Sequence, residues 1–325
     1  MRRREFITFL GGAAAAWSSR AQAQQPAMPV IGLLWLGTER SVQPNVEAFR
    51  SGLAALGYKE GENIRILYGV ANGNVERLSA LASEQVSHGA KIIVTASTTA
   101  IRAVHNAAPN VPIVSWGAAD PVMMGWAQSL ARPGGMITGL FLVASTVAKP
   151  LELLKELRPK ANTFGYLMNA SNPGNPHFKK AVDDAGRTLG FKVEFIEVKH
   201  QSELADAFGR MESLGVEGLA IIPDPLLGAN FTAIAELARL HKVPSVGDNP
   251  GFLDAGGLLA FWSNYQAMAK RTAWFVDQIL KGTAPGELAA EQPTEYKLVV
   301  NLKTAKELGI TIPATILARA DDVIE

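Results

Sequence analysis

The stretch that decides the fold is KIIVTASTTAIRAVHNAAPNVPIVSW, at residues 91–116. Its segments 91–95 and 113–115 are short, apolar and rich in β-branched residues, whereas 98–107 has the length and apolar spacing of a helix. Near-continuously apolar strands are typical of parallel sheets with helices on both faces. A strand, a helix and a second strand in this order therefore predict a βαβ unit of an α/β protein.

The same alternation continues on both sides of this unit. Strands at 30–34 and 64–68 and helices at 46–56 and 75–87 precede it. A second set follows, with strands at 163–168, 192–198, 219–222 and 245–247 and helices at 178–189, 204–214 and 229–241. The two sets also share local sequence, as in VPIV and VPSV before their last strands, so we expect a duplicated unit. The fold class is therefore α/β, with two doubly wound parallel-sheet lobes.

Two lobes made from one chain must be joined by segments that cross between them. The candidate crossings are 139–149, 256–264 and 285–293. They divide the chain into an N-terminal lobe of 29–140 plus 263–290 and a C-terminal lobe of 141–262 plus 291–325, joined by a three-segment hinge. Ligands of open parallel sheets bind beyond the carboxyl ends of the strands, so facing strand ends predict a cleft that closes by hinge motion.

Residues 1–23 have the order of segments found in an export signal. Three arginines at 2–4 are followed by a short apolar stretch at 6–17, and AQA at 21–23 is a small-residue cleavage site. The sequence RREFI within this segment also resembles a twin-arginine signal, with the Sec route as the alternative. We therefore expect a periplasmic protein whose signal peptide is cleaved after Ala23.

Composition excludes several classes of chemistry. The 325 residues contain no cysteine, which rules out disulfides, thiolate nucleophiles and cysteine-ligated zinc. With 31 basic and 30 acidic residues the net charge is +1, which argues against a nucleic-acid partner. The motifs G-x-S-x-G, G-x-x-x-x-G-K-[ST], G-x-G-x-x-G and H-E-x-x-H do not occur, and the five histidines lack metal-ligand spacing. We expect no cofactor, no metal and no catalytic residue.

One terminal stretch carries a family resemblance. The sequence KLVVNLKTAKELGITIP at 297–313 resembles the terminal signature of the ABC-transporter substrate-binding family, whose members include tryptophan- and tyrosine-binding lipoproteins. FRSGLAALGYKEGE at 49–62 is similar to the first helix and turn of that family. Asp120-Pro121 with LARPGGMITG at 130–139 resembles its D-P and L-x-x-P-G-G-N-[IV]-T-G segment. The resemblance covers essentially all of residues 29–313 and implies the periplasmic-binding-protein type I fold, in agreement with the two lobes expected above.

Several hydroxyl-bearing residues lie between the end of a predicted strand and the start of a predicted helix. Thr95, Ser97 and Thr98 stand there, where free backbone N–H groups and the positive end of a helix dipole favour an anion. Asn169 and Ser171 occupy the matching place in the second half. The sequence predicts a carboxylate site, with helix capping and turn formation as the alternative roles of these residues.

Three acids and two tryptophans also lie near predicted strand ends. Asp120, Asp224 and Asp248 each come close to a proline in a loop, and a desolvated ammonium group needs such a carboxylate partner. A cap or turn aspartate is the alternative for each of them. Trp35 and Trp116 follow strands and are placed to stack on a flat ligand, although packing in the core is the commoner role of tryptophan.

The second crossing departs from the family pattern. Family members often carry G-[IV]-D-Y-Y there, whereas this chain has FWSNY at 261–265, so that Ser263 replaces the acid and Asn264 the first aromatic residue. Together with the bulky Trp35 and Trp116, this difference puts an aromatic amino acid ligand in doubt. It favours a smaller or differently charged metabolite, such as another amino acid or carboxylate.

The resemblance implies a function in solute capture. It implies an extracytoplasmic binding protein that takes up a small molecule in its interlobe cleft and delivers it to the permease and ATPase of an ABC importer. We expect a monomer. Two other classes stay open: a ligand-binding sensor for a membrane receptor, and an exported hydrolase or lyase that uses the cleft aspartates for acid–base work.

Overall fold

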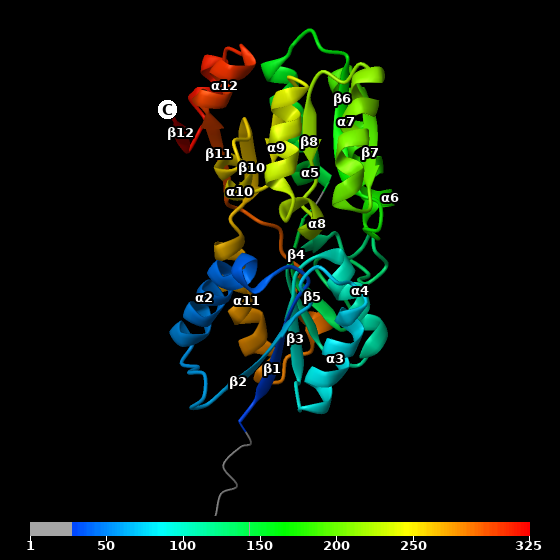
Figure 1. The fold of residues 1–325 in the computed structure, drawn as a ribbon. Helices are drawn as coiled ribbons and strands as arrows, with labels where there is room; N and C mark the ends of the chain where they lie inside the picture. The colour runs from blue at the N-terminus through cyan, green and yellow to red at the C-terminus, as the bar shows by residue number, and fades with distance from the viewer. Residues whose placement is uncertain (1–27, 143) are drawn as a thin grey trace, which may run out of the picture.

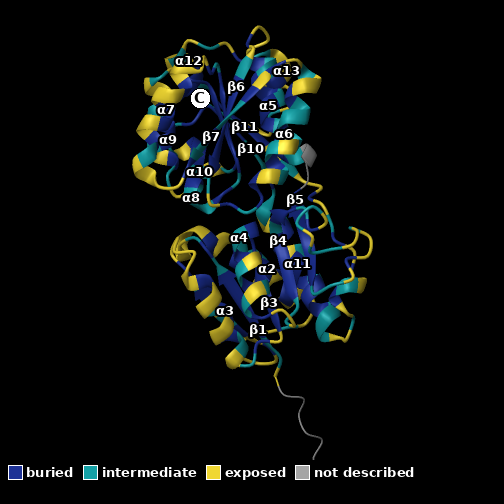
Figure 2. Cartoon of the chain, turned by 90° about the vertical axis from the view of Figure 1, so that its right-hand side faces the viewer, coloured by how far each residue is buried: buried dark blue, intermediate teal, exposed yellow. Residues whose placement is uncertain are grey.

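The computed structural model describes residues 28–142 and 144–325. Together these residues form two lobes, an N-terminal lobe that is lower in Figure 1 and a C-terminal lobe that is upper. The predicted export signal at residues 1–23 lies outside the described residues. In each lobe helices cover a central sheet, and Figure 2 shows the sheets buried between helices whose outer faces are exposed. Within the part of the chain that the structure describes, no helix is both long and apolar enough to span a bilayer.

The sheet of the N-terminal lobe is entirely parallel. Its order is β2-β1-β3-β4-β5. The strands are β1 (Val30–Trp35), β2 (Arg65–Val70), β3 (Ile92–Thr95), β4 (Ile113–Ala119) and β5 (Ile137–Leu142), and the helices between them are α2 (Glu39–Ala55), α3 (Arg77–Ser87) and α4 (Thr98–Ala107). Successive apolar residues of a strand point to opposite faces, so Val94 joins one buried cluster and Ile93 the other. This two-sided burial explains why the strands lack polar alternation.

The sheet of the C-terminal lobe has the order β12-β11-β10-β9-β8-β6-β7. Its strands are β6 (Thr163–Asn169), β7 (Lys192–Val198), β8 (Leu219–Ile221), β9 (Ser245–Gly247), β10 (Leu259–Ser263), β11 (Tyr296–Asn301) and β12 (Asp322–Ile324). Its longer helices are α5 (Ala144–Leu157), α6 (Asn175–Leu189), α7 (Leu204–Ser213), α9 (Phe231–Leu240) and α12 (Leu302–Leu308), and its short helices are α8 (Pro225–Gly228), α10 (Pro250–Asp254) and α13 (Ala314–Leu317). Short 3-10 turns occur at η1 (Gln201–Glu203) in this lobe and at η2 (Pro285–Glu287) beside β5.

The chain changes lobe at three places. After β5 it enters the C-terminal lobe through α5, and after β10 it returns through α11 (Tyr265–Leu280), which packs on α2, β4 and β5. It leaves again between Glu291, which bridges to Leu140 of β5, and the start of β11. Arg271 of α11 holds the carboxylate of Glu291 with two hydrogen bonds of 3.0 and 2.6 Å, which anchors the third crossing to the N-terminal lobe.

Two features differ from the sequence-based expectation. The segment 139–149 was expected to be a crossing, but its first residues belong to β5, which completes the first sheet. In the second sheet β11 runs antiparallel to β10, and β12 follows the direction of β11. The reason is topological: the third crossing delivers the chain at the end of the sheet where the other strands finish, so β11 can only run away from the neighbouring lobe.

Candidate functional site

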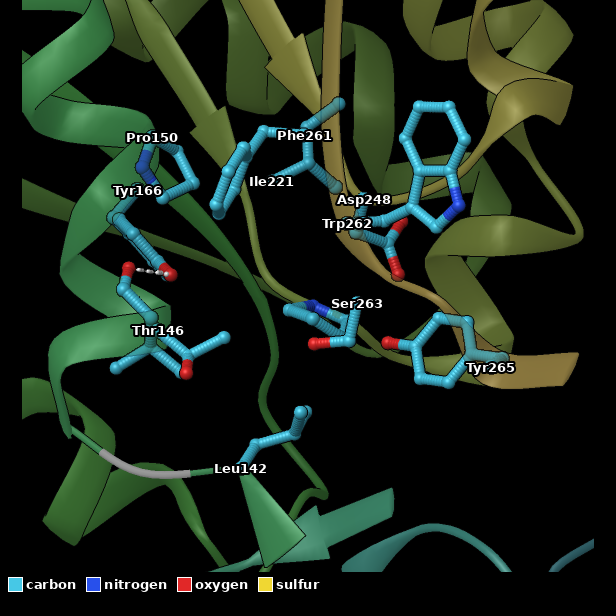
Figure 3. Close-up of a pocket in the computed structure, with 12 residues that line it drawn as sticks. Leu142, Thr146, Pro150, Tyr166, Ile221, Asp248, Phe261, Trp262, Ser263 and Tyr265 are labelled. Atoms are coloured by element: carbon cyan, nitrogen blue, oxygen red, sulfur yellow. Dashed lines mark hydrogen bonds between the residues drawn. The ribbon is translucent and has the colours of Figure 1, made fainter. Parts of the chain in front are cut away.

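A small cavity lies at the hinge, between the strand ends of the C-terminal lobe and the elements that cross to the other lobe (Figure 3). It has a volume of about 10 Å³, which is roughly the space of one water molecule. Its polar lining consists of the side chains of Asp248, Ser263, Tyr265, Tyr166 and Thr146. Apolar groups complete the wall, namely Leu142, Val147, Pro150, Ile221, Pro223, Phe261 and Trp262.

Asp248 is the acid of this cavity. It comes directly after β9 and is only 6% exposed. The single side-chain hydrogen bond of its carboxyl group is a long one, 3.3 Å from the amide of Asn249. Burial, with a smaller contribution from the charge of Asp224, raises the pKa of Asp248 to about 8. Among the described residues that line the cavity there is no lysine, arginine or histidine to compensate a negative charge.

The polar side chains next to Asp248 make no hydrogen bond to its carboxyl group, apart from the long one from Asn249. Ser263, at the end of β10, is 2% exposed, and its hydroxyl has no hydrogen-bond partner among the described residues. Tyr265 begins α11, and burial and the charge of Asp248 raise the pKa of its phenol. Tyr166 of β6 donates its hydroxyl hydrogen to the carbonyl of Val147 at 2.6 Å. In Figure 3 the carboxyl group of Asp248 and the phenol of Tyr265 both point into the space beside Ser263.

Asp224 has the opposite environment, although it follows β8 as Asp248 follows β9. Its Oδ1 accepts hydrogen bonds from Asn169 Nδ2 at 3.1 Å and from the backbone of Leu226 at 2.8 Å. Its Oδ2 accepts a hydrogen bond from Asn172 Nδ2 at 2.9 Å. Burial raises the pKa of Asp224, and these donors oppose the rise. The carboxylate is therefore the N-cap of α8 and the centre of a satisfied network.

The same network shapes the loop after β6. Asn169 Oδ1 accepts from the backbone of Ser171 at 2.9 Å, and Asn172 Oδ1 accepts from Gly174 at 2.9 Å. Asn175 donates to the carbonyl of Asn169 at 2.8 Å. The side chains of Asn169 and Asn172 thus each donate a hydrogen bond through the amide nitrogen and accept one through the amide oxygen. These bonds fix the backbone of the loop that carries Ser171.

The hydroxyl-rich loop of the N-terminal lobe lies where β3 ends and α4 begins, as expected. Thr95 is fully buried and donates its hydroxyl hydrogen to the carbonyl of Leu34 at 2.7 Å. Thr98 accepts a hydrogen bond from the backbone of Ala119 at 3.0 Å, and Ser97 caps α4 by accepting from Ala100 at 3.3 Å. All three hydroxyl groups therefore have structural contacts.

Ser97 also has a rare backbone conformation. Its φ is 72° and its ψ is 143°, a region that is almost exclusive to glycine. Its backbone N–H donates to the carbonyl of Gly117 at 2.8 Å, which ties the loop to β4. Strain of this kind costs roughly 1–3 kcal/mol and tends to occur at functional sites.

The remaining predicted residues lie apart from the hinge cavity. Trp116 is 1% exposed in the core of the N-terminal lobe, with its ring centroid 6.3 Å from that of Phe49 and 6.0 Å from that of Trp35. Trp35 ends β1 half-buried, and its Nε1 donates to Ser41 Oγ at 3.0 Å. Asp120 is half-buried after β4, and one oxygen accepts from the backbone of Val122 at 2.8 Å, as a turn aspartate does.

The two lobes are in contact between the end of β4 and the loop after β6. Ala119, at the end of β4, belongs to the buried cluster of the C-terminal lobe, and Met124 packs against that cluster. A Cβ atom placed on Gly174 would lie 3.3 Å from the Cβ of Ala119. The loop after β6 and the end of β4 are therefore in van der Waals contact across the gap between the lobes.

The sequence predicts most strand ends to within about two residues, but it ends β4 at residue 115 where the strand runs to Ala119, and it does not predict most of the residues that line the cavity. Of the ten predicted site residues, only Asp248 lines it. Ser263 had been noted as a departure from the family pattern, whereas Tyr166 and Thr146 had no signal that distinguished them from core residues. Within the described residues, no group of three or more histidines and acids is placed to hold a metal ion.

Two sheets of mostly parallel strands, joined by three crossings and facing each other at their strand ends, are the architecture of type I periplasmic binding proteins. The chain belongs to the ABC transporter substrate binding protein family, whose sequence profile matches residues 38–324. It is therefore the solute-binding component of an ABC transporter and not an enzyme.

Known relatives cover nearly the whole chain. A tyrosine-binding protein of Clostridioides difficile (strain R20291) is 26% identical over 280 residues, which are 86% of this chain and 81% of that protein. The structure of an ABC domain in complex with L-Trp from Streptococcus pneumonia has a TM-score of 0.84 at 25% identity, covering 92% of this chain and 100% of that one. A ligand-free, open substrate-binding protein with adhesive properties from Clostridium difficile has a TM-score of 0.68 at 25% identity, covering 91% and 99%.

Proposed function

We propose that this protein captures an amino acid between its lobes outside the cytoplasm and delivers it to the permease and ATPase of an ABC importer. The observation that carries the proposal is Asp248, a buried acid at the hinge without a cationic partner. Beside it Ser263 offers a buried hydroxyl group without a partner. Such groups are costly to leave unpaired, and a ligand ammonium group would pair with both of them.

Asp248 is the best ammonium partner among the three predicted aspartates. The carboxylate of Asp224 is already surrounded by donors, and that of Asp120 closes a turn. For the carboxylate of the ligand we propose the loop of Thr95, Ser97 and Thr98, where the N-terminus of α4 supplies a favourable dipole. Two relatives, a tyrosine-binding protein and an ABC domain in complex with L-Trp, support the amino acid class.

Capture requires that the lobes move apart, because the cavity of about 10 Å³ admits an ammonium group but no whole amino acid. We propose that the N-terminal lobe, which includes β5 and α11, rotates as one body against the C-terminal lobe, which includes α5, β10 and β11. The TM-score with the L-Trp complex is 0.84, whereas that with the open, ligand-free relative is 0.68. This difference supports the proposal that the lobes of the present structure are close to a closed, ligand-bound arrangement. The contact of Ala119 with the Gly174 loop is consistent with this arrangement.

A ligand screen tests the proposed function. The mature chain, which should begin at Gln24 by mass spectrometry if export removes the leader, is titrated with the twenty L-amino acids in a thermal-shift assay. We expect at least one to bind, to raise the melting temperature and to make the particle more compact in small-angle scattering. The bound amino acid should be recovered unchanged after denaturation. A chemically altered product, or tight binding without compaction, would contradict the proposal.

The strained Ser97 allows the carboxylate subsite to be tested separately from its role as a helix cap. Ser97→Gly removes the Cβ atom together with the hydroxyl group, so relief of the backbone strain offsets the lost helix cap and the free energy of unfolding should change by less than about 1 kcal/mol. If the hydroxyl binds the ligand carboxylate, affinity should fall roughly 10- to 150-fold, as for loss of one charge-assisted hydrogen bond.

Ser97→Ala is the matched variant. It loses the same hydroxyl group and keeps the Cβ atom that the wild type already carries at a φ of 72°, so it should show the same loss of affinity and, from the lost helix cap, a loss of stability of roughly 0.5–2 kcal/mol. Calorimetric titration and urea unfolding measure the two effects. Unchanged affinity in Ser97→Gly would show that Ser97 only caps α4.

A further inference from the structure

The polar groups around Asp248 are neutral or acidic, and the described residues that line its cavity include no cation. Tyr166 faces it from β6, Tyr265 from α11 and the ionisable Asp224 from the N-terminus of α8. Ser263 of β10 and the amide of Asn249 are neutral. A carboxylate in this place would be buried between two phenols and a second acid, and only the long hydrogen bond from Asn249 and its own backbone N–H would hold its charge. An uncompensated buried charge is avoided in proteins by a change of protonation.

The two neighbouring acids differ in their ability to hold a charge. Asp224 accepts three hydrogen bonds from Asn169, Asn172 and the backbone of Leu226, whereas Asp248 has Asn249 as its one side-chain donor, besides its own backbone N–H. When two acids compete in a buried site, the one with fewer donors keeps the proton. The pKa of Asp248, raised to about 8, agrees with this assignment.

We infer that Asp248 is a neutral acid in the empty protein and that the ammonium group of the ligand displaces its proton to solvent, so that ligand capture is coupled to proton release. The exchange is balanced: a protonated carboxyl group and an ammonium ion become a carboxylate–ammonium pair and one free proton. This inference rests on the proposed function, because it needs an amino acid whose ammonium group reaches the hinge cavity.

The coupling fixes the direction of the pH dependence. The ammonium group stabilises the carboxylate, so the pKa of Asp248 is lower in the complex than in the empty protein. Between these two pKa values the complex holds fewer protons, and affinity rises with pH. With a free pKa of about 8, the association constant should increase about tenfold from pH 6 to pH 7, and about 0.9 proton should be released per ligand at pH 7.

Calorimetric titration measures both quantities on the wild-type protein. The amino acid found in the screen, with L-Trp and L-Tyr as the first probes, is titrated at pH 6 and pH 7 in phosphate and in imidazole, whose ionisation enthalpies differ. The inference predicts the tenfold change and the released proton, and Asp120→Asn should leave both unchanged. Binding that is independent of pH and buffer would overturn the inference and leave the proposed function intact. If no amino acid binds, both fall.

A measurement without ligand tests the protonation of the empty site. The folded pKa of Asp248 lies above the value of about 3.9 in an unfolded chain, so stability from this group is complete below that value and is lost as the pH rises to about 8. Relative to Asp248→Asn, the unfolding equilibrium constant of the wild type should increase about 100-fold between pH 5 and pH 7 in urea titrations. Parallel pH profiles of the two proteins would show an ionised carboxylate and overturn the inference.

Discussion

Replacement of Asp248 by asparagine should abolish high-affinity binding without loss of stability. The amide has the size of the acid and keeps an oxygen for the hydrogen bond from Asn249. It cannot form an ion pair with an ammonium group, and loss of one member of a buried pair costs roughly 3–5 kcal/mol. At pH 8 the dissociation constant should therefore rise at least about 100-fold in calorimetric titrations.

Stability separates this result from simple misfolding. At pH 8 the wild-type protein has begun to ionise Asp248, whereas the asparagine variant carries no charge there. The free energy of unfolding of ligand-free Asp248→Asn should therefore equal or exceed that of the wild type. Asp120→Asn is the matched control, because Asp120 is a half-buried turn residue, and its affinity should stay within about threefold of the wild type. Wild-type affinity in Asp248→Asn would refute the assignment of the ammonium subsite.

The order of strands and helices along the chain and the presence of two lobes were predictable, because both depend on local patterns of apolar residues. Strands such as 91–95 are buried on both faces, so their sequence is apolar throughout, and the spacing of apolar residues in 98–107 gives α4. The direction of β11 was not predictable in this way. It depends on the end of the sheet at which the third crossing delivers the chain, and this is a property of the whole fold and not of residues 296–301.

The candidate site shows the same limit more sharply. Asp224 and Asp248 have similar sequence contexts, each shortly after a strand and within two residues of a proline. Their chemistry differs because Asn169 and Asn172, which are more than 50 residues away in sequence, donate to Asp224 and not to Asp248. Trp116 is a similar case, because a position after an apolar strand did not reveal that Phe49 and Trp35 would enclose its ring.

Asp224→Ala should be among the most destabilising substitutions in the C-terminal lobe. It removes the acceptor of three hydrogen bonds, and the amides of Asn169 and Asn172 are left buried at 8% and 6% exposure. A buried donor without a partner costs about 1–3 kcal/mol. We therefore expect a loss of roughly 3–5 kcal/mol in the free energy of unfolding, measured by urea titration with fluorescence detection.

An exchange of the side chains of residues 172 and 224 tests whether stability depends on the hydrogen-bond network or on the position of the charge at Asp224. In Asp224→Asn one amide N–H would face the amide of Asn172, and the protein should lose stability because two donors meet. In the double variant Asp224→Asn with Asn172→Asp, the new acid accepts from the new amide and can still accept from the backbone of Gly174. Most of the lost stability should return, as a positive coupling in the double-mutant cycle.

The same pair distinguishes a structural Asp224 from a ligand-binding one. If Asp224 only shapes the loop that carries Ser171, the double variant should recover affinity together with stability, because the loop regains its hydrogen bonds. If the carboxylate of Asp224 itself binds the ammonium group, the exchange moves the charge to residue 172, and affinity should stay low while stability recovers. Both oxygens of Asp224 already accept hydrogen bonds, so we expect affinity and stability to recover together. The carboxyl group of Asp248 has no charged partner among the described residues, and we therefore expect ligand binding to depend on Asp248 and not on Asp224.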